Sequence, residues 1–298
     1  MKQWKRLKGR LRFKEPLCRH ASFKIGGEAS IFFEPHDVRD LVNGLKLFKI
    51  NRIPYFLVGN GTNLLISDKG FKGAVIKLSA PFFKNINIKN NIVRVGAGAS
   101  IRSLIERLSQ TNLGGYEFLA GIPATVGGAL IMNAGVTIQG KRFSIADLVR
   151  SVKAVDRRGR ILNLSAKKIN FGYRKSDLGR YIILEAQIKL TKDEKAKVAK
   201  RISGYLSLRR QKQDYSRPNA GCIFKNPSGH LSAGMLIDRC GLKGRRYGGA
   251  IVSKKHANFI LNFNRAKAND VIKLMEIIKK KVKNKFDVSL REELKIVS

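Results

Sequence analysis

Residues 121–135 read Gly-Ile-Pro-Ala-Thr-Val-Gly-Gly-Ala-Leu-Ile-Met-Asn-Ala-Gly. This run contains four glycines, one proline and no charged residue, so it offers little side-chain bulk for packing. Each glycine adds chain entropy that folding must overcome, which disfavours such a run in an ordinary helix or strand. The composition suits a loop whose backbone N–H groups approach a large anionic ligand such as a pyrophosphate. A tight glycine-rich turn without a ligand is the alternative.

A second uncharged, glycine-rich segment occupies residues 59–63, Gly-Asn-Gly-Thr-Asn, directly after a short apolar run at 55–58. Glycine permits positive φ and close approach, while Asn and Thr offer donors and acceptors to a phosphate or ribitol. A strand-ending Asn-Gly turn is the alternative here. Two such loops together favour one ligand with a diphosphate and a second polar group. Neither loop matches the Gly-x-Gly-x-x-Gly fingerprint or a P-loop.

The length and composition indicate a folded protein of 298 residues, long enough for two or three domains. An apolar content of 43% supplies real cores. No run of about 18 apolar residues is present, and the N-terminal residues lack the apolar centre of a secretory signal. The three cysteines, Cys18, Cys222 and Cys240, have no metal-binding spacing. We therefore expect a cytoplasmic protein with no metal and no membrane span.

The charge is strongly positive, because 60 Lys and Arg residues face 21 Asp and Glu residues, giving +39. Such a surface gains affinity for nucleic acids through counterion release, and it also attracts phosphorylated small ligands. A compositional bias with no specific partner explains the charge equally well. Because the basic residues are spread along the whole chain, we do not expect nucleic acid to be the main partner.

The order of the expected elements is mixed. Apolar spacing predicts helices over 37–50 with Asp37 as N-cap, from Ser100 to about residue 110, over 192–212 and over 268–285. Strands are expected at 55–58, 73–78, 92–96, 150–156, 161–164 and 181–190, with a hairpin turn at 157–159. Residues 1–15 are expected to be a flexible basic lead-in. With neither strict βαβ alternation nor an all-β pattern, the fold class is α+β.

Two segments carry side chains suited to chemistry. Tyr173 and Arg174 place a phenol beside a guanidinium, which suits bidentate recognition of a carboxylate or phosphate. In so basic a chain, a solvated arginine is the alternative. Cys222 lies in a segment bounded by Pro218 and Pro227. It is either a thiol held for proton or covalent chemistry or a small buried apolar residue, and the residues alone favour the latter.

Two further candidates lie toward the end of the chain. Glu292 and Glu293 form a carboxylate pair before a short apolar strand pattern, and ion pairing with basic neighbours would also explain them. His256 could donate a hydrogen bond to a substrate or simply belong to a loop. From the residues alone, the chain is predicted to be a cytosolic binder of a phosphorylated cofactor and an enzyme.

Taken together and in this order, these segments resemble the UDP-N-acetylenolpyruvoylglucosamine reductases, the MurB flavoenzymes of peptidoglycan synthesis. The resemblance covers nearly the whole chain and points to the shorter subtype, which lacks an additional tyrosine-bearing loop. The segments that carry it are 22–27, 58–64, 121–135, 172–176, 220–227 and 249–257, followed by Glu293.

The resemblance implies a FAD-binding region of the vanillyl-alcohol-oxidase (PCMH) type made of two α+β subdomains, followed by an α+β substrate-binding domain. The expected ranges are 1–78, 79–192 and 193–298, with the last strand returning to the FAD region. It also implies noncovalent FAD, NADPH as co-substrate, and reduction of UDP-N-acetylglucosamine enolpyruvate to UDP-N-acetylmuramate. A monomer is expected.

The family's functional residues carry over by motif. Cys222 would protonate C2 of the substrate, while Arg174 and Glu293 would stabilise the enolic intermediate. Glu293 is preferred to Glu292 because the family glutamate directly precedes the apolar residue of the last strand, here Leu294. Substrate contacts are expected from Tyr173, Lys225, Asn226 and His256. Contacts to FAD are expected from Gly59, Asn60, Gly61, Thr62, Asn63, Gly121, Ile122, Pro123, Thr125, Gly127, Gly128, Ala129 and Ile183.

Two positions depart from the family pattern. Cys222 stands where the proton donor is usually serine, and a thiol with a free pKa of about 8.5 is the stronger acid. It also exposes the site to oxidation and alkylation. Ala124 stands where glycine is usual, and its methyl group is compatible with FAD unless the position requires a positive φ.

Overall fold

The computed structural model describes residues 4–138, 140–229 and 231–298. The chain forms two compact units, each assembled from non-consecutive segments. The first unit consists of the described residues of Met1–Arg12, Ile31–Gly59 and Gly73–Leu208. The second unit consists of the described residues of Phe13–Ser30, Asn60–Lys72 and Arg209–Ser298. The division into three consecutive ranges stays a prediction.

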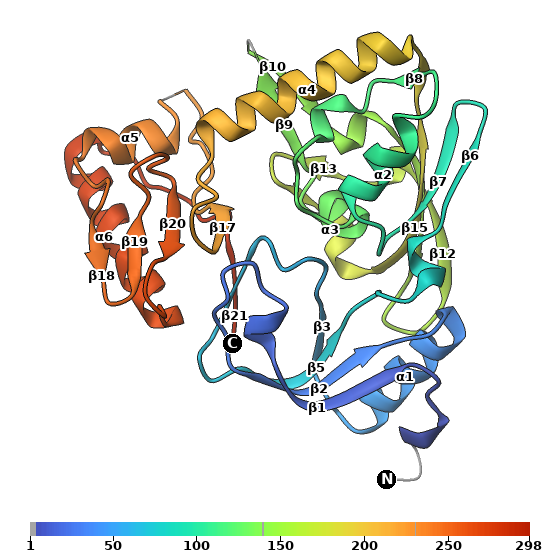
Figure 1. Cartoon of the computed structure of the whole chain (residues 1–298). Coiled ribbons are helices and arrows are strands. Elements are labelled where there is room, and N and C mark those ends of the chain that lie inside the picture. The colour runs from blue at the N-terminus through green and yellow to red at the C-terminus, as the bar shows by residue number, and fades with distance from the viewer. Residues whose placement is uncertain (1–3, 139, 230) are drawn as a thin grey trace. The chain divides into compact units, whose positions relative to one another are not determined.

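The first unit contains a five-stranded antiparallel sheet (Figure 1). Its strands, in spatial order, are β12 (Ile161–Ser165), β11 (Val149–Val155), β15 (Ile182–Lys189), β7 (Ile92–Gly96) and β6 (Ile86–Lys89). The hairpin predicted at 157–159 joins β11 to β12, and Gly159 supplies the positive φ of +82° that the turn requires. Two-stranded ladders are β9 (Gly135–Ile138) with β10 (Lys141–Ser144), β13 (Phe171–Gly172) with β14 (Lys175–Ser176), and β8 (Leu113–Gly114) with β16 (Thr191–Lys192).

A four-stranded sheet has the order β1 (Arg10–Pro16), β2 (Glu28–Glu34), β5 (Phe71–Ile76) and β3 (Tyr55–Leu57). The boundary between the units crosses β1, β2 and β5. The helix α1 (Val38–Ile50) packs in the first unit on Phe33, whose ring centre lies 6.0 Å from that of Phe48. Its N-cap is Asp37, as predicted, because the carboxylate accepts the N–H of Asp40.

The expected flexible lead-in is wrong from Arg10 onward, because β1 begins there. The reason lies in contacts that are distant in sequence. The carboxylate of Asp40 accepts the backbone N–H groups of Lys8 and Gly9 at 2.9 and 2.8 Å. Arg12 forms an ion pair with Glu34 at 2.7 Å. These charged partners hold a basic segment that composition alone does not distinguish from a disordered tail.

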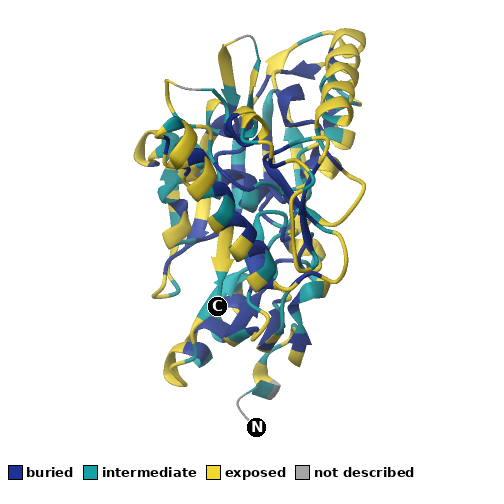
Figure 2. Ribbon diagram, turned by 90° about the vertical axis from the view of Figure 1, so that its left-hand side faces the viewer, coloured by how far each residue is buried: buried dark blue, intermediate teal, exposed yellow. Residues whose placement is uncertain are grey.

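The remaining helices of the first unit are α2 (Ile101–Leu108), α3 (Val126–Ile131) and most of α4 (Lys195–Lys212). Ser100 caps α2, as predicted. The long charged helix also forms where it was predicted, and Val198 is its one buried residue, so most of its surface is exposed (Figure 2). Short 3₁₀ helices of the first unit are Trp4–Arg6, Pro81–Lys84, Glu117–Leu119, Ile145–Asp147, Ala166–Lys168 and Asp177–Arg180, and Leu17–Arg19 is one of the second unit.

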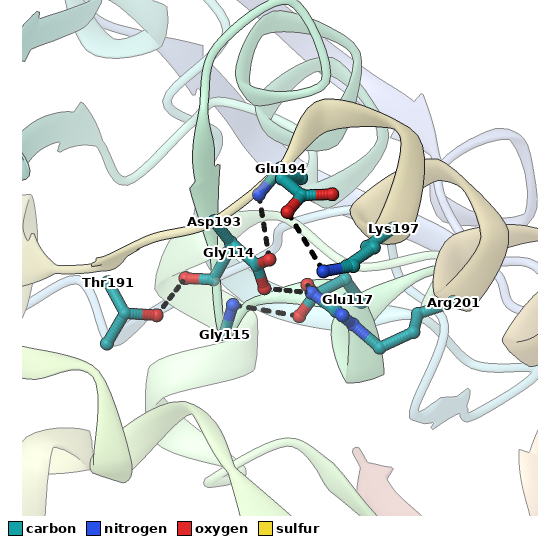
Figure 3. A network of polar contacts seen from close by, with 8 residues as sticks. All are labelled: Gly114, Gly115, Glu117, Thr191, Asp193, Glu194, Lys197 and Arg201. Carbon is teal, nitrogen blue, oxygen red and sulfur yellow. Dashed lines mark hydrogen bonds and ion pairs between the residues drawn. The ribbon is translucent and has the colours of Figure 1, made fainter.

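The helix α4 is anchored in the first unit by a polar network (Figure 3) and by the packing of Val198, Ile202 and Tyr205 on the apolar core. Arg201 donates to the buried carboxylate of Glu117 at 2.6 and 3.1 Å and also pairs with Asp193. Glu117 accepts a further hydrogen bond from the N–H of Gly115 at 2.9 Å. The hydrogen bond from Arg201 holds the pKa of Asp193 below its usual value.

The second unit contains a four-stranded antiparallel sheet with the order β17 (Asn219–Cys222), β20 (Phe259–Asn262), β19 (Ala250–Val252) and β18 (Arg246–Tyr247). Its helices are α5 (Ala233–Arg239) and α6 (Ala268–Phe286), which bury Leu236, Ile237, Leu274 and Ile278 in one apolar core. The last strand, β21 (Lys295–Val297), pairs in parallel with β4 (Leu64–Ile66). The second unit thus contains a ladder between two strands that are far apart in the sequence.

Candidate functional site

The two glycine-rich loops meet in the first unit at Gly59 and Thr125. A Cβ atom at Gly59 would lie 2.6 Å from Oγ1 of Thr125, closer than real side chains approach. The same Oγ1 accepts the N–H of Gly128 at 3.2 Å and so caps α3. Gly59 is therefore required by a close approach of the two loops and not only by a turn.

The run 121–135 is also packed tightly along its own backbone. A Cβ atom at Gly127 would lie 3.1 Å from that of Ala97, and its N–H donates to the Ala97 carbonyl at 2.9 Å. Gly121 has a φ of +77°, which only glycine adopts without strain. Gly127 therefore serves the packing of α3 against Ala97, while Gly121 allows the turn that precedes the helix. The loop is uncharged and small in side chains, which suits a pyrophosphate ligand such as that of FAD.

The departure at Ala124 is compatible with this role. Ala124 does not occur among the described non-glycine residues with positive φ, so its methyl group imposes no backbone strain. Its carbonyl accepts the N–H of Ile101 at 2.9 Å, at the start of α2. Ala124 would disfavour FAD only if its position required a positive φ, and it does not.

The other predicted FAD contacts have different surroundings. Ile183 lies in β15 and is buried in the core of the first unit. In the second unit, Gly61 has a φ of +64°, and a Cβ there would overlap the carbonyl of His20. Asn63 donates through Nδ2 to the Glu293 carbonyl at 3.1 Å. The roles of these residues and of Asn60, Thr62, Ile122, Pro123 and Ala129 toward FAD stay predictions.

Arg174 lies beside the end of the run 121–135 within the first unit. It occupies the turn between β13 and β14 with a φ of +52°. Its Nη1 donates to the Gly135 carbonyl at 3.0 Å, and Ser176 of the same hairpin donates to the Leu130 carbonyl at 2.9 Å. The guanidinium of Arg174 also lies 5.5 Å from the ring centre of Tyr173. The hairpin that carries the two predicted residues is thus fixed to the loop proposed to hold the cofactor.

In the second unit, the segment after Cys222 lies between two other segments. The Ile223 N–H donates to the Asn258 carbonyl at 2.9 Å, and the Ile223 carbonyl accepts the Glu293 N–H at 2.8 Å. Cys222 itself is opposite Phe259 in the β17–β20 ladder. The structure therefore brings together the chain segments that carry Cys222, His256 and Glu293, although Cys222 and Glu293 are 71 positions apart in the sequence.

The environment of His256 favours its neutral form. Burial lowers its pKa, and the charges of Lys243 and Lys212 lower it further, while a backbone hydrogen bond of its own residue acts in the opposite sense. The ring packs 4.6 Å from that of Phe259. Nδ1 accepts the N–H of Asn258 at 3.3 Å. A neutral imidazole that accepts at Nδ1 carries its proton on Nε2, so His256 presents a donor.

The two glutamates near the C-terminus have different surroundings. Glu292 forms an ion pair with Lys279 of α6 at 2.6 Å. Glu293 is held by its backbone, through the contacts of its N–H to Ile223 and of its carbonyl to Asn63. The choice of Glu293 over Glu292 as the functional glutamate stays a prediction.

The remaining predicted substrate residues flank Cys222. Oδ1 of Asn226 accepts the N–H of Ala233 at 3.1 Å, so its amide NH₂ is the group oriented for donation to another partner. The N–H of Lys225 donates to the Arg291 carbonyl at 2.8 Å. Both residues are therefore fixed beside Cys222 by backbone contacts, and their roles toward substrate stay predictions.

Three supporting residues were missed from the sequence. Asn258 clamps both the N–H and the carbonyl of Phe224, at 3.0 and 2.8 Å. The fully buried Ser253 donates to Asp214 at 2.5 Å. No spacing links Asp214 to Ser253, so only the fold shows their contact.

Within the described ranges, no group of three or more His, Cys, Asp or Glu side chains is placed to hold a metal ion. None of the described helices has both the length and the apolar character needed to cross a bilayer.

Comparison with known proteins identifies the family. The model of the UDP-N-acetylenolpyruvoylglucosamine reductase C-terminal domain matches residues 211–297, and the model of a FAD binding domain matches residues 29–165. A UDP-N-acetylenolpyruvoylglucosamine reductase of Caldanaerobacter subterraneus subsp. tengcongensis is 41% identical over 97% of this chain and 94% of its own length. The chain belongs to the UDP-N-acetylenolpyruvoylglucosamine reductase family. A reductase of the same name from Clostridium botulinum is 40% identical over 95% of the chain and 91% of its own length.

The fold agrees with this membership. The crystal structure of the Thermus caldophilus reductase, MurB, superposes with a TM-score of 0.81 at 32% identity, covering 98% of this chain and all of that one. The predicted fold class, α+β with a FAD-binding region and a C-terminal domain, is confirmed. The chain is a flavoprotein oxidoreductase of the MurB family.

Proposed function

We propose that the chain reduces UDP-N-acetylglucosamine enolpyruvate to UDP-N-acetylmuramate with NADPH as the reductant. Two observations support the proposal. The relatives at about 40% identity over nearly the whole chain carry the reductase name. In the second unit, backbone hydrogen bonds connect the segments of Cys222, His256 and Glu293 around one strand end. FAD, when bound, takes electrons from NADPH and supplies the hydride that C3 of the enolpyruvyl group receives.

The chain's residues have separate tasks. The glycine-rich loops that contain Gly59, Gly121 and Gly127 hold the cofactor, as the family pattern implies. Arg174 supplies positive charge to the carboxylate of the enolic intermediate. Cys222 gives its thiol proton to C2 of the substrate, which completes the reduction. The resulting thiolate then regains a proton from solvent.

Substrate binding is assigned to side chains near these groups. His256 donates from Nε2, because Nδ1 is engaged by Asn258. Asn226 donates from its amide NH₂, because Oδ1 is engaged by Ala233. Tyr173 and Lys225 are further contacts implied by the family pattern. Glu293 acts as a hydrogen-bond donor or through an intervening group, because a bare carboxylate would repel the dianionic intermediate.

The proposal is tested by separating the two half-reactions. The purified protein should absorb at about 450 nm, as oxidised flavins do, and anaerobic NADPH should bleach this band. Adding the enolpyruvyl substrate should restore the band and yield UDP-N-acetylmuramate. Absence of that product from the unaltered protein would refute the proposed activity.

The assignment of the proton donor has its own test. Cys222→Ala should still be bleached by NADPH but should not turn over the enolpyruvyl substrate. The matched control is Cys240→Ala, which removes another partly exposed thiol of the second unit and should leave both half-reactions intact. Full turnover in Cys222→Ala would exclude the thiol as the donor.

A further inference from the structure

Asp214 and Ser253 form a buried polar pair in the second unit that the proposed chemistry does not use. Ser253 is fully buried and Asp214 is 8% exposed. The hydroxyl of Ser253 donates to Oδ2 of Asp214 at 2.5 Å. The other carboxylate oxygen, Oδ1, accepts the N–H of Ser216 at 2.9 Å and its hydroxyl at 2.6 Å. A charge buried at this depth is stable only with such partners.

The same hydroxyl shapes the turn that carries His256. Oγ of Ser253 accepts the backbone N–H groups of Lys255 and His256, both at 3.0 Å. Because its proton is committed to Asp214, Ser253 can act toward these N–H groups only as an acceptor. The ionised carboxylate therefore sets the direction in which the hydroxyl points.

The backbone turn held by Ser253 also determines which ring nitrogen of His256 accepts a hydrogen bond. With the His256 backbone held by Ser253, the N–H of Asn258 reaches Nδ1 at 3.3 Å. The Phe259 ring, 4.6 Å away, limits the rotation of the imidazole. A chain of contacts thus runs from Asp214 through Ser253 to the ring of His256.

We propose that Asp214 and Ser253 are positioning residues that hold His256 in the tautomer with the proton on Nε2, facing an acceptor oxygen of the UDP-sugar substrate. The substrate part of this proposal rests on the proposed function. The tautomer part rests on the contacts of the second unit alone. Lys255 extends the support, because its ammonium group donates to the Arg210 carbonyl at 2.6 Å.

Nitrogen-15 NMR of the FAD-loaded protein tests the tautomer directly. The chain has four histidines, so a histidine-labelled sample gives few signals, and His256→Gln assigns the one of interest. At pH 7.5 the wild-type His256 should show a protonated Nε2 and an unprotonated Nδ1. Ser253→Ala should show both tautomers in exchange. A wild-type spectrum in a folded Ser253→Ala protein would overturn the proposal.

Kinetics test the consequence for substrate binding. Ser253→Ala should raise KM for the enolpyruvyl substrate about tenfold and change kcat less, because one oriented hydrogen bond corresponds to a factor of this order. Bleaching of the flavin by NADPH should keep its wild-type rate. An unchanged KM, or an equal loss in both half-reactions, would contradict a positioning role.

Two further variants keep the test sharp. Asp214→Asn retains an oxygen that can accept from Ser253 and should give a smaller effect on the tautomer and on KM, which keeps the proposal testable if Ser253→Ala fails to fold. Glu276→Gln removes an exposed carboxylate of α6, paired with Lys273, and should change neither. If the wild-type protein does not reduce the UDP-sugar at all, the proposed function fails, while the NMR result still decides the tautomer.

Discussion

The close approach of the two glycine-rich loops makes a quantitative prediction for Gly59→Ala. The φ of Gly59 is not positive, so the added methyl group acts through its volume alone. Its Cβ would lie 2.6 Å from Oγ1 of Thr125, which must move. Moving Oγ1 breaks the cap bond to Gly128, at about 1 kcal/mol, and overpacking adds about 1–2 kcal/mol. We expect about 2–3 kcal/mol of lost stability and FAD affinity weakened about 10- to 100-fold.

A double-mutant cycle tests the cause. In Thr125→Ala the nearest side-chain atom to the new methyl group would be Cβ, at an ordinary 3.5 Å. Gly59→Ala combined with Thr125→Ala should therefore lose about 2–3 kcal/mol less than the sum of the single variants, because the cap bond is lost only once and the overpacking is relieved. Urea unfolding of the apoprotein and fluorescence titration with FAD supply the two measurements.

A glycine elsewhere in the first unit provides the control. A Cβ atom added at Gly204 of α4 would have no heavy atom of the described residues within 4 Å, apart from its chain neighbours and its own helix backbone. Gly204→Ala should therefore stabilise the helix by about 0.5–1 kcal/mol and leave FAD binding unchanged. The reasoning is refuted if Gly59→Ala binds FAD like the wild type, or if the double variant shows simple additivity.

Three further predictions concern charge and reactivity. Arg201→Met leaves the buried Glu117 carboxylate without its charged partner. Because water reaches the half-exposed position of Arg201, the loss of stability should be about 2–3 kcal/mol, with Tm lower by about 5–10 °C in calorimetry. Adding Glu117→Gln should recover most of the lost stability. Burial opposes ionisation of Asp214, but hydrogen bonds from Ser216 and from Ser253 outweigh it and lower its pKa. The stability this contributes is complete above the unfolded pKa of about 3.9 and is lost as pH falls through the lower folded value, so urea midpoints below about pH 4 should fall less steeply in Asp214→Asn. Iodoacetamide should block oxidation of the reduced flavin by substrate in the wild type but not in Cys222→Ser; equal inactivation of both would argue against the thiol.

Local features of the fold were predictable because they depend on neighbouring residues. Asp37 and Ser100 cap their helices through residues three positions away, and Gly159 makes its turn within a hairpin. β1 was missed because its order depends on Asp40 and Glu34, which composition does not connect to it. The assembly of each unit from separated segments was missed for the same reason, because it also depends on contacts between residues distant in sequence.

The site divides in the same way. The glycine-rich loops can be recognised in the sequence by their composition. The segment of Cys222 can be recognised by its flanking prolines and by its resemblance to the family motif. The contact between Asp214 and Ser253 joins residues 39 positions apart with no repeating pattern between them. In the sequence, nothing distinguishes this aspartate and this serine from exposed ones, because their burial depends on the fold.

The pairing of β4 with β21 has a consequence for how the protein is made. The side-chain amide of Asn63 donates to the carbonyl of Glu293, which is synthesised 230 residues later. At ribosomal rates of about 5–20 residues per second, β4 remains without this partner for roughly 10–50 s. During synthesis, the apolar edge of β4 is therefore exposed to non-native strand pairing. A ribosome stalled before codon 295 would leave a nascent chain whose second unit cannot close.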